Sequence, residues 1–232
     1  MNSVATATLL MRLAGPMQSW GLDSRFDQRD TSLEPSKSGV LGLICAALGK
    51  PRDDQPGPWP MLSELASMKM GVRVLHEGTL RMDFQTAGGG DFTGRKSYGV
   101  WKASGKAGDT VVSPRHYLSN ADFLVGLNGP QPLLQQISQA LPAPVWQLSL
   151  GRKSYVPTLP LNPTILELEL DKALRSFSPP EKSSKQQTKQ RYVLETPLER
   201  AADRRPDVPI SFLHRTFTVR GVETRWLEAI NE

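Results

Sequence analysis

The chain has 232 residues, a formal net charge of +5 and an isoelectric point near 9.4, which suits one large domain or two small ones. The moderate positive charge permits a nucleic-acid partner without requiring one. The single cysteine, Cys45, excludes a disulfide framework within the chain and indicates a reducing cytoplasm. No apolar run has membrane-spanning length and no basic segment precedes the first apolar residues, so we expect neither a membrane partner nor a signal peptide.

The first predicted elements are a strand and a helix separated by a long loop. Residues 6–13 form a short apolar run, and the Gly-Pro pair that follows cannot continue a central strand. Residues 23–34 are charged and lack periodicity, which is typical of a loop. Apolar spacing then predicts a helix that ends at Leu48, with Ser36 or Ser38 as its N-cap and the next glycine as its stop.

Alternating and helical spacing continues through the middle of the chain. The further predicted elements are a helical turn at 61–66, a strand at 69–77 that continues past a glycine turn through 80–84, a strand at 121–128, a helix at 131–141 and a strand at 145–150. The order is then β-α-β-β-α-β, the ferredoxin-like arrangement shared by many RNA-recognition domains. The sequence therefore predicts an α+β fold.

The C-terminal third is less regular. Leu166, Leu168 and Leu170 alternate with glutamates, as in a strand with one solvent-exposed face. Residues 178–190 are polar and lack an apolar face, so we expect them to be mobile. Residues 210–220 are the last strand candidate.

The start of the predicted helix is a candidate phosphate site. Ser38 and Gly39 can present backbone N–H groups to an anion, and Lys37 adds a positive charge. The alternative is that these residues simply cap the helix.

The aromatic residue after the first strand is a candidate for base stacking. Trp20 lies beside Gln18 and Ser19, and a tryptophan on a surface can stack on a nucleobase. The alternative is a tryptophan in the core.

Residues 87–115 form a glycine-rich basic segment that is unusually long for a loop inside a compact domain. Its glycines allow the backbone to approach a polyanion, its cations neutralise phosphates, and its aromatic rings offer stacking faces. The candidate contacts here are Arg95, Lys96, Tyr98, Trp101 and Arg115, and a second basic loop adds Arg152 and Lys153. The alternative is a flexible, solvated loop.

The inventory for catalysis is poor. The histidines are scattered without metal-ligand spacing, and Gly49-Lys50 lacks the serine or threonine of a phosphate-binding loop, so no cofactor or metal is expected. Metal-independent RNA cleavage needs a base for the 2′-hydroxyl and a cation for the phosphate. Arg115-His116-Tyr117 with Lys102 or Tyr98 can supply such groups, although a lone histidine is more often structural.

Four segments together carry a family resemblance. They are RLAGPMQSWG at 12–21, KSGVLGLICAALG at 37–49 with PRDD at 51–54, PRHYLSNADFLVGL at 114–127 and LGRKSYVP at 150–157. In this order they resemble the CasD family, a subunit of the type I-E CRISPR-associated Cascade complex of the RAMP superfamily. The resemblance runs from residue 12 to about residue 163, and the first two motifs in combination are the most specific.

The resemblance implies a ferredoxin-like, RNA-recognition-motif-like (RRM-like) palm over 1–150, with a β-hairpin thumb inserted at 86–115. It implies a small β-rich C-terminal extension over 151–232. It also implies a non-catalytic subunit that grips the 5′ handle of the CRISPR RNA (crRNA), contacts the backbone and large subunits of Cascade, and supports recognition of invading DNA in antiviral defence. The open alternatives are a metal-independent endoribonuclease that processes precursor crRNA, and a scaffold whose basic loops contact proteins only.

We accordingly predict that one set of residues binds RNA, with Lys37, Arg115 and Arg152 converging along one rim of the sheet. The set is Gln18, Ser19, Trp20, Lys37, Ser38, Gly39, Arg95, Lys96, Tyr98, Trp101, Arg115, His116, Arg152 and Lys153.

Overall fold

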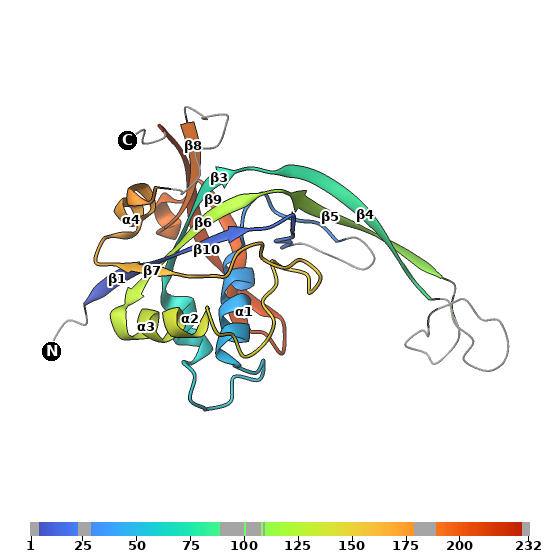
Figure 1. Cartoon of the computed structure of the whole chain (residues 1–232), viewed down its shortest axis with the longest axis horizontal. Coiled ribbons are helices and arrows are strands. Elements are labelled where there is room, and N and C mark those ends of the chain that lie inside the picture. Colours follow the sequence, from blue (N-terminus) through green and yellow to red (C-terminus); the bar gives the residue numbers. More distant parts are fainter. Residues whose placement is uncertain are drawn as a thin grey trace.

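A computed structural model describes residues 5–22, 29–88, 100, 108, 110–178 and 189–228. Within these residues the chain is an α+β structure built on two antiparallel sheets (Figure 1). The larger sheet has seven strands in the order β7-β1-β6-β3-β8-β10-β9, and the smaller has three in the order β2-β5-β4. The strands are β1 (Thr6–Ala14), β2 (Met17–Gln18), β3 (Lys69–His76), β4 (Thr79–Ala87), β5 (Val111–Ser119), β6 (Asp122–Pro130), β7 (Thr164–Leu166), β8 (Lys189–Thr196), β9 (Asp203–Ser211) and β10 (Thr216–Glu228).

Helices cover both faces of the larger sheet. The four α-helices in the described part of the chain are α1 (Lys37–Leu48), α2 (Leu62–Ser67), α3 (Gln131–Ala140) and α4 (Leu170–Ser176), and a short 3-10 helix spans Leu198–Arg200. The main hydrophobic core lies between the sheet and α1, α2 and α3. A smaller core lies on the opposite face, beneath α4.

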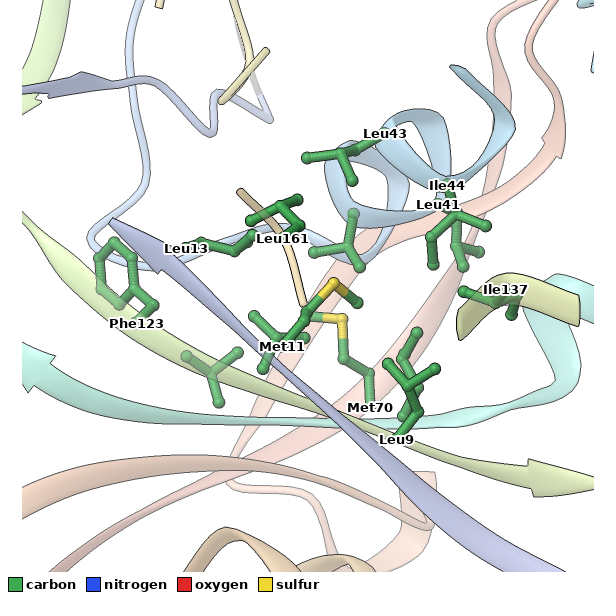
Figure 2. Close-up of a cluster of buried hydrophobic side chains, with 14 of the residues drawn as sticks. Leu9, Met11, Leu13, Leu41, Leu43, Ile44, Met70, Phe123, Ile137 and Leu161 are labelled. Carbon is green, nitrogen blue, oxygen red and sulfur yellow. The ribbon is translucent and has the colours of Figure 1, made fainter. Parts of the chain in front are cut away.

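The predicted first strand is confirmed as β1, which lies between β6 and β7. Leu9, Met11 and Leu13 project into the main core, whereas Leu10 projects into the smaller one. A strand buried on both faces needs a nearly continuous apolar run, as this sequence has. Figure 2 shows the β1 side chains facing those of α1 and α3, and each such burial stabilises the fold by about 1.5–3 kcal/mol.

The predicted helices at the start and middle of the chain are also confirmed. Ser36 is the N-cap of α1, with its hydroxyl accepting from the N–H of Gly39, and Gly49 ends the helix in the left-handed conformation with φ of 68°. The helical turn predicted at 61–66 is α2, and the helix predicted at 131–141 is α3.

The fourth strand of the β-α-β-β-α-β pattern was placed wrongly. The segment 145–150 is not a strand, because the N–H groups of Val145 and Trp146 donate to Ala47 and Ala46, near the end of α1. The strand that follows α3 is β7, which pairs with β1. Four strands of the larger sheet, β7-β1-β6-β3, therefore adjoin in the chain order β1-α1-β3-β6-α3-β7.

The C-terminal predictions need two corrections. The strand predicted at 166–170 ends at Leu166. Leu170 instead begins α4, and the buried side chains of this helix are those of Leu170, Ala173 and Leu174. The strand predicted at 210–220 is a hairpin, since β9 ends at Ser211 and β10 begins at Thr216. Strands β8, β9 and β10 extend the same sheet that β1 belongs to.

A two-stranded arm extends from the body of the molecule, as Figure 1 shows. It consists of β4 and β5, paired from Thr79 opposite Ser119 to Ala87 opposite Val111. The hairpin therefore begins before residue 86, where the resemblance places the start of the thumb. The polar segment 178–190, expected to be mobile, falls for the most part outside the described residues.

Candidate nucleic-acid interface

Gln18 and Trp20 lie in the protein interior, where neither can contact a base in solvent. Trp20 is 1% exposed and Gln18 is fully buried. The Gln18 amide donates to the carbonyl oxygens of Leu13 at 3.0 Å and Ala121 at 2.8 Å, and its oxygen accepts from Trp20 Nε1 at 3.1 Å. The predicted base-stacking role of Trp20 is therefore wrong, and the alternative of a core tryptophan holds.

Ser19 is mostly buried, and its backbone contacts the second basic loop. Its N–H donates to the carbonyl of Leu150 at 3.0 Å. A Cβ added to Gly151, whose φ is 96°, would lie 1.8 Å from the Ser19 carbonyl oxygen. Only glycine fits so close to another backbone in this conformation. The contact fixes the start of the loop that carries Arg152 and Lys153.

Lys37 is buried as well, and the predicted contact between its ammonium group and phosphate is wrong. Its side chain is 1% exposed, and Nζ lies 3.1 and 3.0 Å from the two carboxylate oxygens of Glu195. Burial lowers the pKa of Lys37, and the charge of Glu195 opposes that shift. The Lys37 N–H donates to Asp207 Oδ2 at 2.7 Å, so a carboxylate already occupies the start of α1.

The contacts of Lys37 belong to a larger buried ion network. Arg220 donates to both carboxylate oxygens of Asp207, at 2.7 and 2.9 Å, and Arg220 Nη1 lies 3.6 Å from Glu195. Buried charges of this kind are tolerated because each is paired. The network fastens the N-terminus of α1 to β8, β9 and β10.

Ser38 and Gly39 lie half-buried in the first turn of α1. The Gly39 N–H donates to Ser36 Oγ at 3.3 Å, and a Cβ added to Gly39 would lie 2.8 Å from the Trp20 ring. Capping and close packing against the tryptophan account for the glycine, as the alternative interpretation expected. An RNA contact by Ser38 stays a prediction.

Two segments that are distant in sequence meet beside β5 at the root of the arm. The Arg29 N–H donates to the Pro114 carbonyl at 3.0 Å, and the Arg29 carbonyl accepts from the His116 N–H at 2.7 Å. Arg152 Nη2 donates to the carbonyls of His116 at 2.9 Å and Arg29 at 3.4 Å. The structure therefore brings Arg152 together with the β5 segment that contains Arg115.

The register of the arm decides which of its side chains share a face. Residues paired across two strands project to the same side, and here Arg81 is opposite Tyr117 while Asp83 is opposite Arg115. Arg81 is exposed and Arg115 is half-buried, with its Nε donating to Ser113 Oγ at 3.0 Å.

Several cations gather at the root of the arm, where the carboxylate of Asp83 lies opposite Arg115. We define the arm-root surface as Arg29, Arg81, Arg115, Arg152 and Lys153. Arg29, Arg81 and Lys153 are exposed. Neither Arg29 nor Arg81 was among the predicted site residues, because the loop and strand that carry them show no motif.

His116 lies on the other face of the arm. It is opposite Met82, and alternation along β5 separates it from its neighbours Arg115 and Tyr117. The three residues considered for metal-independent cleavage are thus divided between two faces. Of the predicted thumb contacts, Arg95, Lys96, Tyr98 and Trp101 lie outside the described residues, as does Lys102.

The described residues contain no group of three or more histidine, cysteine, aspartate or glutamate side chains arranged to hold a metal ion. They also contain no helix with the length and apolar character needed to cross a membrane.

Comparison with known proteins identifies the family. The profile described as CRISPR-associated protein (Cas_Cas5) matches residues 8–223. The chain belongs to the Cas5/CasD family of CRISPR-associated proteins. A relative in Escherichia coli (strain K12), named CRISPR system Cascade subunit CasD, is 32% identical over an alignment 185 residues long that covers 74% of this chain and 77% of that protein. The resemblance to CasD is therefore confirmed.

Two solved structures share the fold of this Cas5/CasD family member. One, described as "Crystal structure of Cas protein", is 36% identical with a TM-score of 0.70, and the match covers 96% of this chain and 95% of that one. The other, described as "CRISPR RNA-guided surveillance complex", is 33% identical with a TM-score of 0.74 and covers 96% of this chain and 90% of that one.

Proposed function

We propose that this Cas5/CasD family member is a non-catalytic, RNA-binding subunit of a CRISPR Cascade surveillance complex and grips the 5′ handle of crRNA. The name of the E. coli relative, a Cascade subunit, and that of the solved RNA-guided surveillance complex support this assignment. Within the complex the subunit contacts the backbone and large subunits, and through them supports recognition of invading DNA.

The observation that carries the proposal is the meeting of cationic segments at the arm-root surface. Arg152 donates to the backbone of both Arg29 and His116, so three segments hold a common position. Lysine and arginine side chains neutralise phosphates and release counterions, whereas base edges and stacking supply specificity. A single RNA strand lying across the arm root would meet Arg81, Arg115 and Lys153 in this arrangement.

The topology supports an RRM-like palm as the platform. The chain order β1-α1-β3-β6-α3-β7, with these strands adjoining as β7-β1-β6-β3, is that of a β-α-β-β-α-β unit. This platform is stabilised from the protein interior by Gln18, Trp20 and Lys37. Arg95, Lys96, Tyr98 and Trp101 on the thumb remain proposed RNA contacts.

Equilibrium binding of the purified full chain to labelled handle RNA, in EDTA and over a range of salt concentrations, tests the proposal. We expect tight binding that weakens as salt rises, without cleavage. Arg81→Ala should weaken binding. Lys172→Ala is the matched control, since Lys172 is an exposed cation on α4, at the opposite end of the molecule from the arm (Figure 1).

Two outcomes would contradict the proposal. Site-specific cleavage of labelled repeat RNA, abolished by His116→Ala, would establish the metal-independent endoribonuclease instead. Absence of RNA binding, with partner proteins still captured, would establish the protein-only scaffold.

A further inference from the structure

A pocket opens beside the arm root, on the α1 face of the larger sheet. Its volume is about 740 Å³, within the range of small-molecule sites. Its walls come from residues 32–34, from Glu77 just before β4, and from β8, β9 and β10. The pocket is separate from the arm-root surface but lies close to it along the chain, because residues 32–34 come three to five positions after Arg29 and Glu77 comes two positions before β4.

The floor of the pocket is an ion network with no net charge. Glu34, which is 3% exposed, accepts from Arg191 Nη1 at 2.5 Å and from Arg205. Arg191 also donates to both carboxylate oxygens of Glu77, at 2.8 and 2.6 Å. With Arg204 and Asp203 included, three guanidinium groups face three carboxylates in the lining.

This balance disfavours a simple ion as the occupant. A phosphate would meet the carboxylates of Glu34 and Glu77, and a metal ion would meet the guanidinium of Arg191. A neutral planar group with both donors and acceptors on its edge suits such a floor better, because arginine donates and glutamate accepts. Nucleobases carry donors and acceptors of this kind.

One wall of the pocket offers a flat aromatic surface. Trp226 on β10 is 58% exposed, which is high for the largest side chain, and Leu33, which also lines the pocket, is 56% exposed. Bases stack on exposed aromatic rings with little regard to sequence. Arg204 is exposed at the mouth, where a flanking phosphate would lie.

We infer that this pocket receives one flipped-out nucleobase of the bound RNA, stacked on Trp226 with its polar edge toward Arg191 and the partly exposed carboxylate of Glu77. The inference rests on the proposed function and deepens it, since it assigns a base-binding subsite next to the phosphate-binding arm root. A strand whose phosphates lie along Arg29 and Arg115 delivers a neighbouring base to residues 32–34.

A coupling experiment between protein and RNA tests the inference. Handle RNAs that each lack one base (a single abasic nucleotide) are bound by the wild type and by Trp226→Ala. With intact RNA, the variant should bind about tenfold more weakly, as expected for the loss of one base–aromatic stack. At one abasic position the wild type should lose the same factor and Trp226→Ala should lose nothing further.

Two further variants sharpen the result. Trp226→Phe should keep most of the affinity, because phenylalanine still offers a stacking face. Trp146→Ala is the matched control, because Trp146 is a 49% exposed tryptophan that does not line this pocket. Trp146→Ala should bind every RNA as the wild type does.

Several results would overturn the inference. If the wild type binds the RNA and Trp226→Ala binds it equally well, the pocket is not a base site, and the proposed function stands. If Trp226→Ala binds every abasic RNA more weakly than the wild type does, and by the same factor each time, the inference is overturned too. Retained RNA binding with lost association of a partner subunit would make the pocket a protein contact. If the wild type fails to bind handle RNA at all, both proposals fall together.

Discussion

The guanidinium of Arg152 donates a hydrogen bond of 2.9 Å to the backbone carbonyl of His116. It also reaches the Arg29 carbonyl at 3.4 Å and the Tyr155 hydroxyl at 2.8 Å, and it lies 5.4 Å from the centre of the Tyr155 ring. Most of its donors are therefore directed at the protein. Arg152 holds the residue 29 segment and the second basic loop against β5, so we propose that it acts in RNA binding by positioning the neighbouring cations.

Arg152→Lys should weaken handle binding without changing its dependence on salt. Lysine keeps the charge but cannot reproduce the planar fork that joins two carbonyls and a hydroxyl. We expect a stability loss of about 1 kcal/mol, since the partly buried His116 carbonyl and Tyr155 hydroxyl lose their donor. Binding isotherms at several salt concentrations, with urea unfolding of the same samples, measure both effects.

Lys153→Ala provides the contrasting case. Lys153 is exposed, so removal of its charge should lower the salt slope by about 0.7, the value for one phosphate contact on a single strand. If Arg152→Lys changes the salt slope and Lys153→Ala does not, then Arg152 contacts phosphate and Lys153 does not, which contradicts both predictions.

Arg115→Ala should weaken handle binding by about 1–3 kcal/mol, as the loss of one charge-assisted contact does. Arg115 shares a face of the arm with Arg81, and its Nε is held by Ser113 Oγ. Titration with labelled RNA at moderate salt gives the difference directly. Affinity equal to that of Lys172→Ala would place the RNA elsewhere on the molecule.

Lys37→Met should destabilise the fold by about 1–3 kcal/mol, because it leaves the half-buried carboxylate of Glu195, whose side chain is 19% exposed, without its closest cation. Arg220, 3.6 Å from Glu195, compensates only in part. The midpoint of urea unfolding measures the change, and Lys172→Ala should stay within about 0.5 kcal/mol of the wild type. A stable Lys37→Met protein that has lost RNA affinity would restore Lys37 as a phosphate ligand.

Local sequence patterns were sufficient to predict β1, α1 and α3. Each depends on features that lie within a few residues of one another, such as the Ser36 cap, the Gly49 stop and the apolar spacing between them. The segment 145–150 shows the limit of this approach. Its alternation suits a strand, but its N–H groups bind the end of α1, and no short-range pattern reports that partner.

The site was harder to predict because its residues depend on long-range pairing. Lys37 has the charge of a phosphate ligand, but its ammonium group pairs with Glu195, which lies 158 residues away in sequence. Tryptophan occurs both in protein cores and on surfaces that stack on bases. Only the packing around Trp20 decides between these two environments. Arg29 and Arg81 join the arm-root surface through backbone pairing with β5 and through the β4–β5 register.

Gly151→Ala should destabilise the protein and weaken RNA binding together. An added Cβ would lie 1.8 Å from the Ser19 carbonyl, so the loop that carries Arg152 and Lys153 has to move. We expect a loss of more than about 1 kcal/mol in the free energy of unfolding, since alanine is also strained at this positive φ. Thermal unfolding measures it, and a variant with unchanged stability would show that the loop is not held by this contact.

Cys45 provides a prediction for pH dependence. Burial raises the pKa of its thiol from the ordinary value of 9.0 to about 11. The unfolded chain therefore releases this proton at a lower pH than the folded chain does, so the thiol's contribution to stability falls as pH rises from about 9 toward 11. Lys37, whose pKa is lowered by burial, changes stability in the opposite direction, so a variant is needed to isolate the thiol.

Comparison of the wild type with Cys45→Ala isolates that term. Between about pH 8 and about pH 10, the wild type should lose about 1 kcal/mol more unfolding free energy than Cys45→Ala does. The native thiol should also react slowly with a disulfide reagent near pH 8, because the thiolate is the reactive form and Cys45 is buried. Equal pH dependence in the two proteins, with fast labelling of the native wild type, would mean that Cys45 is open to solvent and that α1 does not pack as described.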